Sequence, residues 1–209
     1  DRGNLSRPSV QKVYDYRHYV TNAIKTLLDK VKDEKLLQLL EIGIHHEKQH
    51  QELLVTDIKY ILGNNPLLPA YTDSINEHKE ENHRQDWISM DAGIYEIGHN
   101  MDSFCFDNEQ ARHKVYLQAY EISNKLVTNS EYLEFINGGG YSSFELWHAE
   151  GWDWVCKNQI SSPLYWHAID GEWYNYTLEG LQKINGNTPI THLSYFEAFA
   201  FAQWKGYRL

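Results

Sequence analysis

The chain has 209 residues, a formal net charge of −10 at pH 7 and 42% hydrophobic residues, enough for one large or two small domains with a real core. The acidic balance argues against nucleic acid or an anionic membrane surface as partner, because phosphate binding needs a basic surface. We expect neither a membrane span nor a signal peptide, since no apolar run has the required length or position. Only two cysteines, Cys105 and Cys156, are present, so we expect free thiols in a reducing, cytoplasmic environment.

Two long helices are predicted in the first third of the chain. Apolar residues recur at helical spacing through "RPSVQKVYDYRHYVTNAIKTLLDKV", for which Ser6 is the expected cap and Pro8 lies in the first turn. The second helix is predicted over "KDEKLLQLLEIGIHHEKQHQELLVTDIKYIL", and Gly63 with the following "NNP" ends it. The short turn between them implies an antiparallel pair. Such a pair cannot bury its apolar faces alone, so we expect a bundle with further helices.

The remainder of the chain has a different character. Residues 71–86 are predicted to be a linker, within a stretch that begins with prolines and becomes charged. Strands are expected in "WISMDAGIYEIGH" and "RHKVYLQAYEISNKLV". Short helices are expected in "TNSEYLEFINGGG", "SFELWHAEGWDWVCKN" and "SYFEAFAFAQWKGYRL", with Trp- and Gly-rich segments between them. The fold class is therefore α+β, with helices in residues 1–70 and an irregular domain in residues 87–209.

Several further residues have structural interpretations. We expect Cys105 and Cys156 to be small buried residues, and Trp152 and Trp154 to belong to the core. The glycine run at 138–140 is predicted to stop a helix and turn the chain. Surface positions or hydrogen bonds within the fold are expected for four scattered histidines: His113, His148, His167 and His192.

The second helix carries three histidines in "EIGIHHEKQHQELL". His46 and His50 are four residues apart and therefore share one face of the helix. Leu39, Ile42 and Leu53 lie near that side, so we expect the pair to face the interior of the bundle. Two inward imidazoles need partners, and a divalent metal would supply one. The alternative is one hydrogen-bonded core histidine and one solvated histidine.

The same residues match H-E-x-x-H, the zinc-protease motif in which Glu47 would be the general base. The longer metzincin motif would require glycine at 53 and histidine at 56, where this chain has Leu53 and Thr56. A simpler zinc hydrolase with a glutamate ligand stays open.

At "HHEKQHQELLVTDIKY" the chain resembles the sulfoxide synthases of ergothioneine biosynthesis. Members of that family join a DinB-like helical bundle to a domain of the formylglycine-generating-enzyme type, which has a C-type-lectin-like fold. Further similar blocks follow in the family's order: "RGNLSRPSVQKVYDYRHYV", "FDNEQARHKVYLQAYEISNKLVTNSEYLEFINGGGY", "PLYWHAIDGEWYNYTLEGL" and "PITHLSYFEAFAFAQWKGYRL". The resemblance implies a partial DinB-like bundle in residues 1–70 and a partial formylglycine-generating-enzyme-like domain in residues 87–209, with both ends of the chain being cuts within a larger protein.

The resemblance also implies a non-haem Fe(II) site with three histidine ligands, of which His46 and His50 match two. The third ligand is expected from an earlier helix, and the catalytic tyrosine from a later segment. Gln49 resembles a residue that contacts the substrate imidazole, and Arg2 one that holds the carboxylates of γ-glutamylcysteine. Glu52 completes the family pattern and is expected to point away from the metal.

The implied reaction is the O₂-dependent joining of hercynine (Nα-trimethylhistidine) to the thiol of cysteine or γ-glutamylcysteine, which gives a sulfoxide. Histidine ligands leave positions on Fe(II) open, so substrates can meet on one ion. Three alternatives remain: a 5-histidylcysteine sulfoxide synthase of ovothiol synthesis, a zinc-dependent hydrolase or thiol transferase, and a lectin-like binding module with structural histidines.

Overall fold

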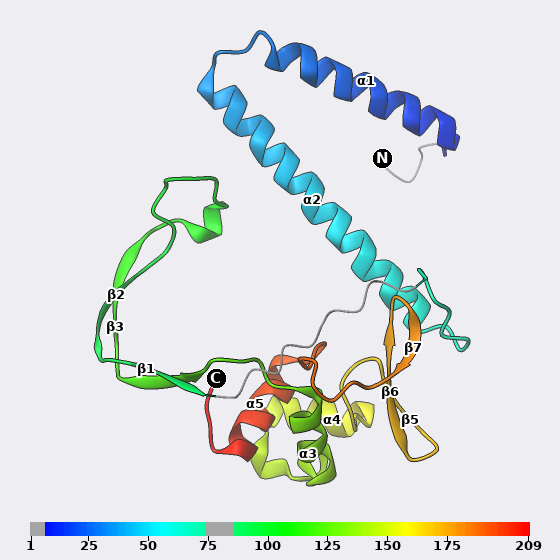
Figure 1. The fold of residues 1–209 in the computed structure, drawn as a ribbon, viewed down its shortest axis with the longest axis vertical. Coiled ribbons are helices and arrows are strands. Elements are labelled where there is room, and N and C mark those ends of the chain that lie inside the picture. Colours follow the sequence, from blue (N-terminus) through cyan, green and yellow to red (C-terminus); the bar gives the residue numbers. More distant parts are fainter. Residues whose placement is uncertain (1–6, 74–85) are drawn as a thin grey trace. The chain divides into compact units, whose positions relative to one another are not determined.

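The computed structural model describes residues 7–73 and 86–209, and the chain divides into two compact units, 1–54 and 55–209 (Figure 1). The division falls inside the second long helix, so the end of that helix is packed with the second unit. Arg2, Ser6 and most of the predicted linker lie outside the described residues.

The first unit consists of α1 (Val10–Leu28) and most of α2 (Glu34–Gly63), as the apolar periodicity predicts. The predicted place of Pro8 in the first turn of α1 is wrong. Ser9 is the N-cap: its backbone is extended, and its hydroxyl accepts a hydrogen bond from the Lys12 backbone amide at 3.3 Å. Ser9 satisfies one of the amides that have no partner within the helix, so the helix begins after Pro8.

Neither helix of the first unit buries a residue in the described structure. Arg17 and Glu47 form an ion pair that joins α1 to α2, but apolar side chains such as Val13 and Leu39 stay more than half exposed. The predicted bundle is therefore not completed by these two helices. Further helices, needed to cover their apolar faces, stay a prediction.

The second unit begins its sheet structure with a long two-stranded ribbon. Strand β1 (Trp87–Met90) pairs antiparallel with β4 (Tyr120–Ser123), and β2 (Gly93–Ile97) pairs antiparallel with β3 (His113–Leu117). Met90 opposes Tyr120 and Gly93 opposes Leu117, so the register continues without a shift from one pair to the next. These strands occur where β-forming residues predict them.

The core of the second unit is aromatic and lies among three short helices, α3 (Asn129–Asn137), α4 (Ala149–Asn158) and α5 (Tyr195–Lys205). The rings of Tyr132 on α3 and Phe201 on α5 are stacked with centroids 5.4 Å apart. Both α3 and α5 begin with a capping box, formed by Thr128 with Glu131 and by Ser194 with Glu197. The three helices confirm the predicted α+β character.

A three-stranded antiparallel sheet, β5 (Trp166–Ile169), β6 (Glu172–Thr177) and β7 (Gly180–Lys183), lies between α4 and α5 in the sequence. The Trp- and Gly-rich composition of this region predicts no strands there. The turn between β5 and β6 is Asp170–Gly171, and both residues have positive φ. Asp-Gly between β-forming residues is a strong hairpin signal, so these two strands were predictable from the sequence.

The structural interpretations of single residues are only partly correct. Cys105 is half-buried, but Cys156 is exposed, so its predicted burial is wrong. The buried face of α4 carries Gly151 and Val155, and the residue after Val155 turns away from it. Trp152 and Trp154 pack against the core as predicted. The glycine run ends α3, with Gly139 in the left-handed region.

The four scattered histidines have different environments. His113 is exposed, and its Nδ1 donates to the Ala111 carbonyl at 2.9 Å. His148 stacks on Phe199 with centroids 3.8 Å apart. Among the described residues, the buried Nε2 of His167 has no hydrogen-bond partner. His192 contacts Lys59 and Tyr165. No helix in residues 7–73 or 86–209 combines the length and apolar character that crossing a membrane requires.

Candidate metal centre

The regular geometry of α2 places the imidazoles of His46 and His50 side by side. Their ring centroids are 4.5 Å apart, and the ring planes are inclined at 78°. The shared face that the four-residue spacing predicts is therefore present. Both residues are exposed, which corrects the expectation that they face a bundle interior. The physical reason is that α1 contacts this part of α2 through the exposed Arg17–Glu47 ion pair, and no residue of α2 is buried.

Two neighbouring imidazoles can supply two of the ligands that a metal ion needs. Within residues 7–73 and 86–209, no group of three or more His, Cys, Asp or Glu side chains is placed to hold an ion. Histidines one turn apart on a helix can bind the same metal, and imidazole nitrogen suits iron, zinc and copper alike. The donor set therefore fits a transition metal, provided that further ligands come from elsewhere.

Glu47 follows His46 but points to another side of the helix. Its Oε1 accepts a hydrogen bond from Arg17 Nη1 at 2.8 Å. That hydrogen bond and the Arg17 charge lower the pKa of Glu47 below its ordinary value. A general base works best with a pKa near the operating pH, so the arrangement does not favour the role that the H-E-x-x-H motif gives to Glu47. Arg17, on the other helix, was not foreseen as a neighbour because no sequence pattern relates positions 30 residues apart.

Gln49 is exposed and precedes His50 directly. At about 100° per residue, Gln49 lies on one flank of the histidine pair and Glu47 on the other. A side-chain amide on that flank could reach a molecule bound beside the imidazoles. Arg2, the other predicted substrate-binding residue, lies outside the described residues, so its role stays a prediction.

Comparison with known proteins identifies a protein family for most of the second unit. Residues 72–209 match the model of the sulfatase-modifying factor enzyme 1-like domain. The chain is 26% identical over 197 residues to a protein named hercynine oxygenase from Mycolicibacterium thermoresistibile, covering 91% of this chain and 42% of the relative. It is 31% identical over 166 residues to a hercynine oxygenase from Mycobacterium tuberculosis, covering 79% of this chain and 38% of the relative.

A third relative is ergothioneine biosynthesis protein 1 from Schizosaccharomyces pombe, which is 28% identical over 123 residues, or 58% of this chain and 14% of the relative. The chain thus spans well under half the length of these relatives. The family match nevertheless covers more than half of the chain and confirms the predicted formylglycine-generating-enzyme type of domain. With its irregular α+β second unit and aromatic core, the chain belongs to the family of the sulfatase-modifying factor enzyme 1-like domain.

Proposed function

We propose that this chain is part of a non-haem iron(II)- and O₂-dependent sulfoxide synthase of ergothioneine biosynthesis. The observation that carries the proposal is the adjacent His46–His50 pair on α2, in a chain whose relatives include proteins named hercynine oxygenase. Hercynine and the thiol of cysteine or γ-glutamylcysteine would be the substrates. The C–H bond of the hercynine imidazole and the S–H bond break, a C–S bond forms, and O₂ supplies one oxygen to the sulfoxide and one to water.

His46 and His50 would hold the iron as neutral imidazole donors, with a third nitrogen donor expected from another helix of a DinB-like bundle. Fe(II), when bound, supplies the redox chemistry that couples O₂ to C–S bond formation. Gln49, on the flank of the pair, would hydrogen-bond the substrate imidazole and orient its reacting carbon. Arg2 would bind a substrate carboxylate as a charge-assisted hydrogen-bond donor.

The ion pair between Arg17 and Glu47 supports this proposal over a zinc hydrolase with the same two histidines. A hydrolase of that type needs Glu47 to accept a proton from water, whereas the Arg17 guanidinium lowers the pKa of Glu47 and therefore its basicity. Two relatives are named hercynine oxygenase, which favours trimethylated histidine over the free histidine that ovothiol synthesis would use.

The decisive experiment uses the full-length protein, purified without oxygen and loaded with Fe(II). We expect O₂ uptake that requires both hercynine and a thiol, and a product whose mass equals that of the joined substrates with one added oxygen. If histidine in place of hercynine is the substrate that supports O₂ uptake, the ovothiol alternative is correct instead. Peptidase activity with zinc, and no iron-dependent O₂ uptake, would contradict the proposal.

A further inference from the structure

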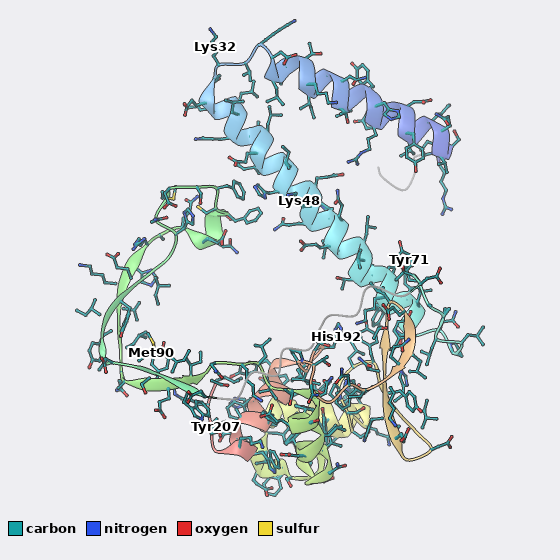
Figure 2. All side chains as sticks on the ribbon, in the orientation of Figure 1. Lys32, Lys48, Tyr71, Met90, His192 and Tyr207 are labelled. Carbon is teal, nitrogen blue, oxygen red and sulfur yellow. The ribbon has the colours of Figure 1, made fainter. Side chains whose placement is uncertain are left out.

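Three side chains that the proposed reaction does not use converge near the end of α2. The Nζ of Lys59 on α2 lies 2.7 Å from Nε2 of His192, in the segment before α5, and 4.9 Å from the centroid of the Tyr165 ring, just before β5 (Figure 2 labels His192). The Tyr165 and His192 rings meet edge to face with centroids 4.9 Å apart. We call Lys59, Tyr165 and His192 the α2 anchor.

The Lys59–His192 contact requires particular protonation states of the two side chains. A lysine ammonium carries only donors, so His192 must be neutral and accept at Nε2, which places its own proton on Nδ1. Partial burial lowers the pKa of Lys59, and partial burial together with the Lys59 charge lowers the pKa of His192. The lowered pKa of His192 favours the neutral imidazole that this contact requires.

Two of the three residues have an unfavourable backbone conformation. Tyr165 has φ 72° and His192 has φ 62°, both in the left-handed region that residues with large side chains rarely adopt. Such a conformation costs on the order of 1–3 kcal/mol per residue and persists only when the surroundings impose it. Here the two conformations turn both rings toward one lysine.

The end of α2 is shaped to receive the anchor. A Cβ atom at Gly63 would lie 2.9 Å from ring carbons of Tyr165 and Tyr176, so only glycine lets the helix end approach these rings. Beyond the helix, the Tyr176 hydroxyl donates to the Pro69 carbonyl at 2.8 Å, and the Tyr71 amide donates to the Leu178 carbonyl at 2.8 Å. The final turn of α2 is thus held by both polar and packing contacts within the second unit.

Lys59 and the candidate ligand His50 belong to the same helix, α2, nine residues apart in the sequence. We propose that Lys59, Tyr165 and His192 are positioning residues that fix the end of the metal-ligating helix on the sulfatase-modifying factor-like domain and thereby control turnover. This inference rests on the proposed function. A rigid helix is the kind of element through which a change at one end reaches the other.

The contact itself is tested without activity, in the full chain, by following the His192 imidazole through a pH titration by NMR. Lys59→Met keeps the length of the side chain and removes its charge, so the pKa of His192 should rise. Lys35→Met, also on α2, is the matched control and should leave it unchanged. Hydrogen exchange of the amides at 60–63 should become about tenfold faster in Lys59→Met only, because one charge-assisted hydrogen bond is lost. An unchanged His192 titration and unchanged exchange would overturn the anchor.

The positioning role is tested in the full-length, iron-loaded protein. We expect Lys59→Met to lower kcat about tenfold while the KM for hercynine and the iron dissociation constant stay unchanged. Loss of the anchor would misplace the reacting groups, although no anchor residue touches them. Lys59→Arg, which still donates to His192, should restore most of the rate. Unaltered kcat in Lys59→Met refutes the positioning role alone. Absence of hercynine turnover in the wild type refutes the proposed function and the positioning role together, while the titration still decides whether the anchor exists.

Discussion

Arg17 Nη1 on α1 donates to Glu47 Oε1 on α2 at 2.8 Å, directly beside the candidate ligand His46. The pair is a polar link between the two long helices, and it engages the carboxylate that a zinc hydrolase would need as its base. The ion pair therefore disfavours Glu47 as a general base, which is the role that the motif H-E-x-x-H would give it.

The first prediction concerns this carboxylate. Glu47→Gln should keep iron binding and sulfoxide formation within about threefold of the wild type, because the proposed reaction does not use Glu47 as a base. Loss of a true general base typically lowers the rate by about 100- to 10,000-fold. Steady-state O₂ uptake by the full-length enzyme measures the effect, and a loss in that larger range would restore the hydrolase-type role of Glu47.

The second prediction concerns the histidine pair. His46→Ala and His50→Ala should each abolish stoichiometric iron binding and product formation, since each removes one of the few nitrogen donors of the ion. Iron content per chain, measured after anaerobic loading, checks this directly. His18→Ala on α1 removes an exposed imidazole outside the site and serves as the control. Full iron occupancy in either ligand variant would place the metal elsewhere.

The third prediction separates binding of substrate from binding of metal. Gln49→Ala should raise the KM for hercynine about tenfold, the size expected for loss of one or two substrate hydrogen bonds, with iron content unchanged. Gln38→Ala, an exposed glutamine earlier on α2, is the matched control. Initial rates at varied hercynine concentration distinguish the outcomes. An iron-deficient Gln49→Ala protein would show that this residue supports the metal site instead.

The fourth prediction concerns the buried core of the second unit. The Tyr141 hydroxyl donates to Glu197 Oε1 at 2.6 Å, and Glu197 is only 2% exposed. Tyr141→Phe removes this donor and leaves a buried carboxylate oxygen without it, which should lower the free energy of unfolding by about 1–3 kcal/mol. Urea denaturation measures the change. Tyr174→Phe removes an exposed hydroxyl with a 3.5 Å contact and should have little effect; equal losses in both variants would contradict the argument.

The fifth prediction compares two glycines of the same helix. Gly63→Ala should destabilise the second unit, because its Cβ would lie 2.9 Å from the rings of Tyr165 and Tyr176. Gly43→Ala has nothing within 4 Å of the added Cβ and should stabilise α2 by about 0.5–1 kcal/mol through reduced backbone entropy of the unfolded chain. Thermal unfolding of both variants gives the comparison. If Gly63→Ala were stabilising, the rings of Tyr165 and Tyr176 would have to move aside at little cost, which would contradict the argument.

Local sequence determined much of the secondary structure. The helical periodicity predicts α1 and α2, because side chains 3.6 residues apart must face one side, and alternation predicts the ribbon of β1 to β4. Asp170–Gly171 also contained the signal for the β5–β6 hairpin, although the aromatic composition around it concealed the strands. The start of α1 at Ser9 instead of Ser6 shows that closely spaced capping residues compete, and that pattern alone does not choose between them.

The sequence alone also predicts that His46 and His50 share a helix face, since a spacing of four residues is nearly one helical turn. Only tertiary structure decided which groups surround them and hold their helix. Arg17 meets Glu47 across 30 residues and Lys59 meets His192 across 133, and no local pattern encodes such pairs. These contacts depend on how separate elements pack, because a hydrogen bond between distant residues forms only when the whole chain brings its donor and acceptor together.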